Sequence, residues 1–196
     1  MRIRKTSKDR VDQILDVALK LFLKHGYAEV QIEHIRAETG LSRGGFYHHF
    51  GSKSAVMQAL VEREQNALAQ AAGPDLCALL TKGSSYLDAT AGVEHSLSAP
   101  DDITLYLGYL EKAQDHFLAP LIEEALSQTG NLPMPAEHAA QIILSVNHRI
   151  TRQVLTGHWA QDAAVSFTRS ALIGCEAMLD KPGLFAPVLT ALDDTA

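Results

Sequence analysis

The sequence lacks several features that would place it in other classes of protein. Only two of its 196 residues are cysteine, Cys77 and Cys175. Both lie in apolar helical patterns, which favours two small core residues in a reducing compartment over a structural disulfide. No apolar run is long enough for a membrane span, and the basic segment Met1–Arg10 is not followed by the apolar stretch of a signal peptide. We therefore expect a cytoplasmic protein with no membrane partner and no cofactor.

An overall excess of positive charge is also missing, since the formal net charge is -6. That value argues against a nucleic-acid partner until the charge is counted by region. Residues 1–63 hold 11 Lys and Arg against 7 Asp and Glu, a formal charge of +4, whereas residues 64–196 hold 6 against 16, a charge of -10. The basic head fits contact with a polyanion, and the acidic body keeps the rest of the chain away from it.

Segments in which apolar and polar residues alternate, as in strands, are scarce. Apolar residues instead recur at spacings of three and four residues almost throughout the sequence. The sequence therefore predicts an all-α fold. Caps and breakers, such as Thr6 or Ser7, Gly26, Gly40, Ser42 and Ser52, divide it into segments. The expected helices lie near residues 7–25, 31–39, 43–50, 53–72, 75–90, 102–117, 119–129, 136–157 and 162–180.

The first three helices form a helix-turn-helix with a supporting helix in front. The second and third are too short to be stable alone, so they must share a core. Apolar residues predicted for that core are Phe22, Ile35, Leu41, Phe46 and Phe50. This arrangement turns the polar face of the third helix outward.

That outward face carries two glycines, Gly44 and Gly45, among hydrogen-bond donors. Each glycine costs about 1 kcal/mol relative to alanine inside a helix. Close approach to the DNA major groove would compensate, because the missing side chains let the helix axis sink toward the base edges. The alternative is a flexible loop, against which Phe46 and Phe50 argue by their four-residue spacing.

The adjacent pair His48 and His49 suggests a metal site, but neighbouring helical positions point about 100° apart and no companion ligand stands four residues away. We therefore expect no metal here. Imidazoles can instead donate to phosphate or base edges, as can the hydroxyl of Tyr47. Lys53 begins the next helix, whose dipole also favours an anion.

Residues 10–60 resemble the DNA-binding domain of the TetR family. The segments that carry the resemblance are Ile14–Phe22, His25–Tyr27, Ile35, Gly40–Phe50 and Ser52–Lys53. The resemblance implies that Ser42–His49 is the recognition helix. It also implies that phosphates are met by Gln31, Arg43, Tyr47, His49 and Lys53. Gly44, Gly45 and His48 would then lie nearest the bases.

Two positions depart from the family pattern. Val30 stands where a capping Thr or Ser is usual, so Gln31 would have to serve both the start of the second helix and a phosphate. Arg36 stands where alanine is usual. Its side chain can reach DNA or lie along the protein surface, and we favour the surface.

The two long helices near 136–157 and 162–180 have apolar faces wider than a surface helix needs. They predict a homodimer completed by a second copy, as the resemblance also implies. The alternative is burial on both sides within one chain. Candidate interface residues are Ile143, Ile150, Val154, Leu172, Cys175 and Leu179.

A pocket for an unknown small-molecule effector is expected in the same region, although each candidate residue taken alone fits the core or the surface better than a ligand contact. The resemblance implies a pocket between helices 75–90, 102–117 and 136–157. The candidate residues are Tyr86, Tyr106, Tyr109, His116, Asn147 and His148.

The resulting hypothesis is a DNA-binding domain at residues 1–52, followed by a ligand-binding and dimerisation domain at 53–196. Its function would be a transcriptional regulator, expected to be a repressor released from a palindromic DNA operator by the effector. An enzyme is the first alternative, but no catalytic triad, phosphate-binding glycine loop or HExxH pair is present. A protein-interaction module that has lost DNA binding is the second, kept open by Val30 and Arg36.

Overall fold

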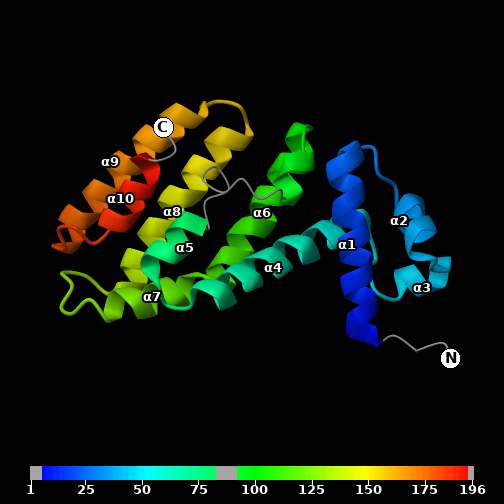
Figure 1. Cartoon of the computed structure of the whole chain (residues 1–196), viewed down its shortest axis with the longest axis horizontal. Coiled ribbons are helices and arrows are strands. Elements are labelled where there is room, and N and C mark those ends of the chain that lie inside the picture. The colour runs from blue at the N-terminus through cyan, green and yellow to red at the C-terminus, as the bar shows by residue number, and fades with distance from the viewer. Residues whose placement is uncertain (1–5, 83–91, 194–196) are drawn as a thin grey trace. The chain divides into compact units, whose positions relative to one another are not determined.

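The computed structural model describes residues 6–82 and 92–193, whose regular elements are helices (Figure 1). In chain order these are α1 (Ser7–His25), α2 (Ile32–Thr39), α3 (Arg43–Tyr47), α4 (Lys53–Ala72), α5 (Leu76–Lys82), the 3-10 helix η1 (Val93–Ser96), α6 (Pro100–Phe117), α7 (Ala119–Ser127), α8 (Ala136–Leu155), α9 (Gln161–Leu179) and α10 (Ala186–Asp193). The prediction of an all-α fold is confirmed.

The chain divides into two compact units. The first comprises the described residues of 1–63 and 91–106, and the second those of 64–90 and 107–196. The first unit thus extends past residue 52, where the predicted DNA-binding domain ends, to take in the start of α4, η1 and the start of α6. Helices α4 and α6 each contribute residues to both units.

Local signals in the sequence set the helix ends of the first unit. Thr6 and Asp9 form a capping box at the start of α1, in which the Thr6 hydroxyl accepts from the Asp9 amide at 3.1 Å. Gly40 ends α2 in the left-handed region, with φ of 67°, where a side chain would be strained. Ser52 caps α4, its Oγ accepting from the Ala55 amide at 3.0 Å.

The core of the first unit is built from one face of each helix. Four of its largest members, Ile14, Phe22, Ile35 and Phe46, have no exposed surface. Complete burial of side chains of this size contributes about 1.5–3 kcal/mol each. Of the five residues predicted for this core, Leu41 is only half-buried, and Val30, with 1% of its surface exposed, lies inside instead.

The segment η1 was not predicted and packs against α1. Its Ser96 carbonyl accepts from the Tyr27 amide at 2.9 Å, just beyond the end of α1. The buried Glu94 accepts from the Tyr106 hydroxyl at 3.3 Å. A segment distant in sequence therefore holds the α1–α2 turn in place.

The second unit centres on α7, α8 and α9, with α5 and α10 packed against them. Its core includes Leu118, Ile122, Leu126, Leu144 and Leu179, each at most 2% exposed. The tail after residue 183 forms α10 and buries Val188 and Leu192 in this core. Among the described helices, none combines the length and the apolar character that crossing a bilayer requires.

Candidate functional site

Helix α3 is a short helix fixed from both ends. Ser42 caps it, its Oγ accepting from the Gly45 amide at 3.1 Å. Phe46 is completely buried and packs against Phe50, with ring centroids 6.2 Å apart. The helix ends at Tyr47 rather than at Phe50 as predicted, because His48 is its C-cap and the following amides fold back onto the Phe46 carbonyl.

The nine residues predicted to meet DNA lie on or next to this helix and the starts of α2 and α4. Six are exposed: Gln31, Ser42, Arg43, Gly44, Tyr47 and His48. Gly45, His49 and Lys53 are half-buried. The Arg43 guanidinium lies 5.8 Å from the centroid of the Tyr47 ring, so these two side chains occupy one side of α3. The outward face of α3 therefore carries exposed and half-buried hydrogen-bond donors, and the opposite side of the helix carries buried apolar side chains.

The two glycines of α3 have different surroundings. A Cβ at Gly44 would meet nothing within 4 Å, whereas a Cβ at Gly45 would lie 3.1 Å from Ser42 Oγ, the capping atom. The protein's own packing therefore does not require a glycine at position 44, and Gly44 leaves open space on the surface. Gly45 is partly explained by the cap, so a bulky residue there would disturb the fold as well as the outward face.

Gln31 and His34 form a reciprocal capping box at the start of α2. The Gln31 side chain accepts from the His34 backbone amide, and the imidazole Nδ1 of His34 accepts from the Gln31 amide at 3.2 Å. The exposed Gln31 side chain therefore serves the helix start, as expected, and only its remaining donors can meet a phosphate. Val30 replaces a capping hydroxyl with a core side chain.

Arg36 is half-buried in α2, and its Nε is buried without a hydrogen-bond partner among the described residues. A side chain reaching toward DNA would be extended into solvent along its whole length. The position of Nε supports the interpretation that Arg36 lies along the protein surface.

Lys53 has two neighbours within the protein. Its ammonium donates to the carbonyl oxygens of Tyr27 at 2.8 Å and Ala28 at 3.2 Å, and it lies 4.3 Å from the Tyr27 ring centroid. Desolvation lowers the pKa of Lys53, while the carboxylates of Asp102 and Glu29 act in the opposite direction. An ammonium has three donors, so one remains for a phosphate after the two carbonyls are served.

His48 and His49 stack edge to face, with ring centroids 5.2 Å apart. In the part of the chain that the structure describes, no group of three His, Cys, Asp or Glu residues is placed to hold a metal ion. The two imidazoles carry nitrogens that can donate hydrogen bonds to a phosphate or a base edge.

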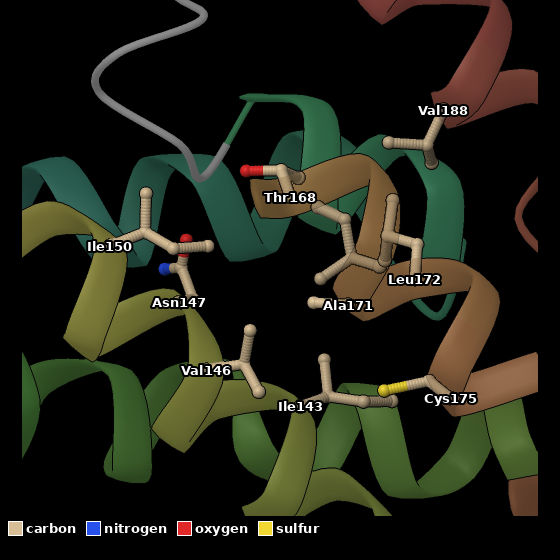
Figure 2. A pocket seen from close by; sticks show the side chains of 10 residues that line it. Ile143, Val146, Asn147, Ile150, Thr168, Ala171, Leu172, Cys175 and Val188 are labelled. Carbon is tan, nitrogen blue, oxygen red and sulfur yellow. The ribbon is translucent and has the colours of Figure 1, made fainter. Parts of the chain in front are cut away.

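The second unit contains a small apolar cavity between α5, α8, α9 and α10 (Figure 2). Its volume is about 30 Å³, room for little more than a water molecule, whereas pockets for drug-sized ligands span about 300–1,000 Å³. Side chains of α8, including Asn147, and of α9, including Thr168, line opposite sides of it in Figure 2. A larger ligand would require these helices to separate.

The structure does not bring the six predicted effector residues together. Asn147 lines the cavity, and His148 lies beside it in sequence on a different face of α8. Tyr106 belongs to the first unit, where its hydroxyl is used by Glu94. Tyr109 is half-buried, His116 is exposed beside Phe117, and Tyr86 lies outside the described residues.

Five of the six residues predicted for the dimer interface are buried within the chain: Ile143, Ile150, Leu172, Cys175 and Leu179. Val154 is half-buried. These side chains fill the chain's own core because α8 and α9 use that face to pack against each other and against α7 and α10. The exposed apolar residues of the two helices are different ones: Ile142 at 37%, Phe167 at 41% and Ile173 at 52% exposure.

The two cysteines are free, and Cys175 is buried while Cys77 is half-buried. Burial raises the pKa of both thiols, and the carboxylate of Asp75 adds to this effect at Cys77. A thiol with a raised pKa is a weak nucleophile near neutral pH. These residues act as small core side chains.

Comparison with known proteins identifies relatives of this chain. Residues 14–60 match the family described as bacterial regulatory proteins, tetR family. The HTH-type transcriptional regulator SrpR of Pseudomonas putida is 26% identical over 157 residues, which cover 78% of this chain and 66% of SrpR. The HTH-type transcriptional repressor AcnR of Corynebacterium efficiens is 34% identical over 58 residues, covering 30% of this chain and 31% of AcnR.

The matched part of the chain thus spans less than two thirds of the length of these curated relatives. Among solved structures, the fold is similar to that of RolR in complex with the ligand resorcinol. The match covers 94% of this chain and 93% of the RolR chain, with a TM-score of 0.62 and 16% sequence identity. At that identity the likeness concerns the fold alone.

Proposed function

The chain is a TetR-family protein that carries the family's N-terminal domain at residues 14–60, and on this premise we propose that it is a DNA-binding transcriptional repressor. In this proposal two copies bind a palindromic operator, and a small-molecule effector releases them. Reading two half-sites about one helical turn or more apart requires two recognition helices in one particle.

One observation carries the proposal: α3 presents donors and bare backbone on a rigid base. Phe46 is completely buried and Ser42 caps the helix, so the outward face does not depend on DNA for its order. Gly44 leaves open space where a base pair can approach. Preformed donors of this kind suit phosphate oxygens and major-groove acceptors.

We place the dimer interface on the outward side of α8 and α9. Ile142, Phe167 and Ile173 are exposed there, and a shallow apolar groove runs between Ile142, Val146 and Phe167. The aromatic rings of Phe167 and Trp159 pack together at 4.9 Å, which enlarges the patch. These residues replace the buried ones predicted from the sequence, because only exposed side chains can contact a second copy in this fold.

Repression is supported by AcnR, which is named a repressor. RolR, which is similar to this chain in fold, is bound to resorcinol, an uncharged aromatic molecule. Release requires that the effector prefer the conformation with low DNA affinity, with a coupling of about 1–3 kcal/mol. The continuity of α4 and α6 across the two units offers a route for that coupling.

The proposal is tested by selecting bound duplexes from a random DNA pool with the full chain and sequencing them. We expect a palindrome, and affinity for it should fall steeply as salt rises. Failure to retain any duplex even at low ionic strength would rule the proposal out.

The dimer is tested separately by sedimentation of Phe167→Asp. We expect this variant to be monomeric, because the aspartate would bring an unpaired charge into the interface. The matched control is Leu23→Asp in α1, which alters a similarly exposed leucine of the first unit and should remain dimeric.

A further inference from the structure

The cavity between α5, α8, α9 and α10 is a space inside the core of the second unit. Its most deeply buried lining residues are at most 7% exposed: Ile143, Ile150, Thr168, Leu172, Cys175 and Val188. Protein interiors are close-packed, and an empty space costs the contacts that its lining atoms would otherwise make. Stability of the folded chain therefore gives no reason for the cavity.

Ala171 keeps this space open. It lies one turn after Thr168 and one turn before Cys175, so all three line the cavity from one face of α9. A valine at position 171 would project into the volume of about 30 Å³, and burying its added methyl groups would stabilise the fold. The chain thus leaves unfilled a space that a common larger residue would occupy.

The lining is apolar toward one end and polar toward the other. In Figure 2, Leu172, Cys175 and Val188 lie toward one end of the cavity, and the amide of Asn147 lies toward the opposite end. An amide offers both an acceptor and donors. A molecule with an apolar body and one polar group matches this distribution.

No charged side chain of the described residues lines the cavity. The Arg and Glu residues closest to the lining positions along α8 and α9 are engaged or directed elsewhere. Arg149 and Arg152 are exposed. Arg169 pairs with Asp193. Glu176 accepts from a backbone amide just before α10 at 2.7 Å. An ion inside the cavity would leave water without gaining a counter-charge, which favours an uncharged ligand.

Val146 is shared by the cavity and by the shallow groove on the outward side of α8 and α9. A side chain that lines both spaces is the wall between them, and Val146 is only half-buried. A molecule in the groove is therefore one side chain away from the cavity. None of the residues that line the cavity belongs to α6, so its position differs from the pocket that the family resemblance implies.

We propose that this cavity is the effector site, that ligands enter it past Val146, and that the effector is a small, uncharged, mostly apolar molecule whose single polar group meets Asn147. This inference rests on the proposed function, because it names the site and the chemical class of that effector. A molecule larger than the cavity has to separate α8 from α9, so its binding favours a conformation in which these helices lie further apart.

The test uses four probes of nearly equal size: phenol, toluene, benzoate and benzylammonium. Each is titrated into the full chain by calorimetry, and its location is read from the NMR methyl signals of Val146 and Val188, assigned from their loss in Val146→Ala and Val188→Ala. We expect phenol and toluene to bind more tightly than either ion, by about tenfold or more, and to shift these signals. Binding of either ion as tightly as phenol, or no binding of phenol at millimolar concentration, would overturn the proposal.

Ala171→Val fills the cavity. It should weaken phenol binding by about tenfold or more, because the ligand would have to displace the added methyl groups, while the melting temperature stays equal or rises. The control is Ala186→Val, the same change at an exposed position of α10, which should leave phenol binding unchanged. Unchanged phenol binding in Ala171→Val would place the ligand elsewhere and overturn the proposal.

Ile150→Val enlarges the cavity and serves if Ala171→Val fails to fold. Removing one methylene from a buried isoleucine should lower the melting temperature by about 2–4 °C and tighten phenol binding. Phenol binding that is unchanged or weaker in a folded Ile150→Val chain would contradict a ligand in this space.

Two further variants test the roles of single residues. Asn147→Leu should weaken the binding of phenol relative to that of toluene, and this ratio is insensitive to a general change in stability. An unchanged ratio would remove Asn147 from the site. Val146→Ala should speed the exchange of bound toluene, measured by NMR line broadening, and an unchanged rate would overturn the entry route past Val146.

The same samples are tested for binding to the selected operator. A chain that binds DNA but does not bind phenol in the cavity refutes only this inference. A chain that does not bind DNA refutes the proposed function, whatever the probes do.

Discussion

The face of α3 and the interior of the second unit place their polar groups in opposite environments. On α3 the polar groups of Arg43, Tyr47 and His48 lie at the surface, where water satisfies them until a partner arrives. In the second unit, both polar atoms of the Gln114 amide and the Nε2 of His148 are buried and have no partner among the described residues. The first arrangement costs the folded protein little, and the second costs it stability.

This difference indicates two kinds of binding. A surface of satisfied donors can meet a large polyanion at any time, and its affinity depends on salt. An unsatisfied polar group in the interior gains most from any change that completes its hydrogen bonds, and that gain is available for shifting a conformational equilibrium. The predictions below test whether the two regions behave this differently, from the largest expected effect to the smallest.

Phe46→Ala should remove the rigid base of the recognition face. Truncating a completely buried phenylalanine costs about 3–5 kcal/mol. We expect DNA binding to be lost and the first unit to unfold at lower denaturant concentration, measured by hydrogen exchange of α1–α3. The control is Leu23→Ala, which shortens a residue with 38% exposure and should have little effect. Full DNA affinity in Phe46→Ala would show that the face does not need its base.

Lys53→Met should show whether a surface cation can have a structural role as well. Loss of its bonds to the Tyr27 and Ala28 carbonyls should lower the free energy of unfolding by about 1 kcal/mol, measured by denaturant titration. Loss of a phosphate contact should also reduce the salt slope of DNA binding by about 1. Lys20→Met, which changes an exposed lysine of α1, is the control for stability. An unchanged slope would limit Lys53 to its structural role.

Gly44→Ala should stabilise the protein and weaken its recognition of the operator. The added methyl meets nothing within 4 Å, so the helix should gain about 0.5–1 kcal/mol. We expect operator affinity to fall at the same time, by about tenfold, measured by fluorescence anisotropy. The matched variant Gly45→Ala should gain less stability, because its methyl presses on Ser42 Oγ. Equal operator affinity in Gly44→Ala would place this position away from the bases.

The pH dependence of stability should reveal the buried imidazole of His148. Because the pKa of His148 is lowered in the folded chain, the unfolded chain takes up a proton first as the pH falls below about 6.5. Stability associated with His148 is therefore present above this pH and is lost as the pH falls toward the folded pKa. His148→Leu should flatten this part of the curve, measured by urea denaturation between pH 7.5 and pH 5. An identical curve in the variant would contradict the assignment.

The sequence predicted the helices whose ends carry local signals. Thr6, Gly26, Gly40 and Ser52 mark their ends within the covalent neighbourhood, so the bounds of α1, α2 and α4 followed from capping chemistry alone. The exposed face of α3 followed from Phe46 and Phe50, because their spacing determines which side is buried.

The interior could not be predicted in the same way. The apolar width of α8 and α9 suggested an interface, but whether a stripe packs on its own chain or on a second copy depends on where α7 and α10 lie. Ile143, predicted to face a second copy, is therefore buried within the chain, whereas its neighbour Ile142 is exposed. Gln114 carried no sequence signal, because a glutamine in a helix is ordinary until its surroundings are known.

The bond between the Gln31 amide and His34 also orients one exposed ring. An imidazole that accepts at Nδ1 can donate only from Nε2. Since His34 is exposed, that N–H is one further donor at the positive end of the α2 dipole, beside the Gln31 side chain. The tautomer selected by a structural bond thus extends the array of outward donors to a residue outside α3.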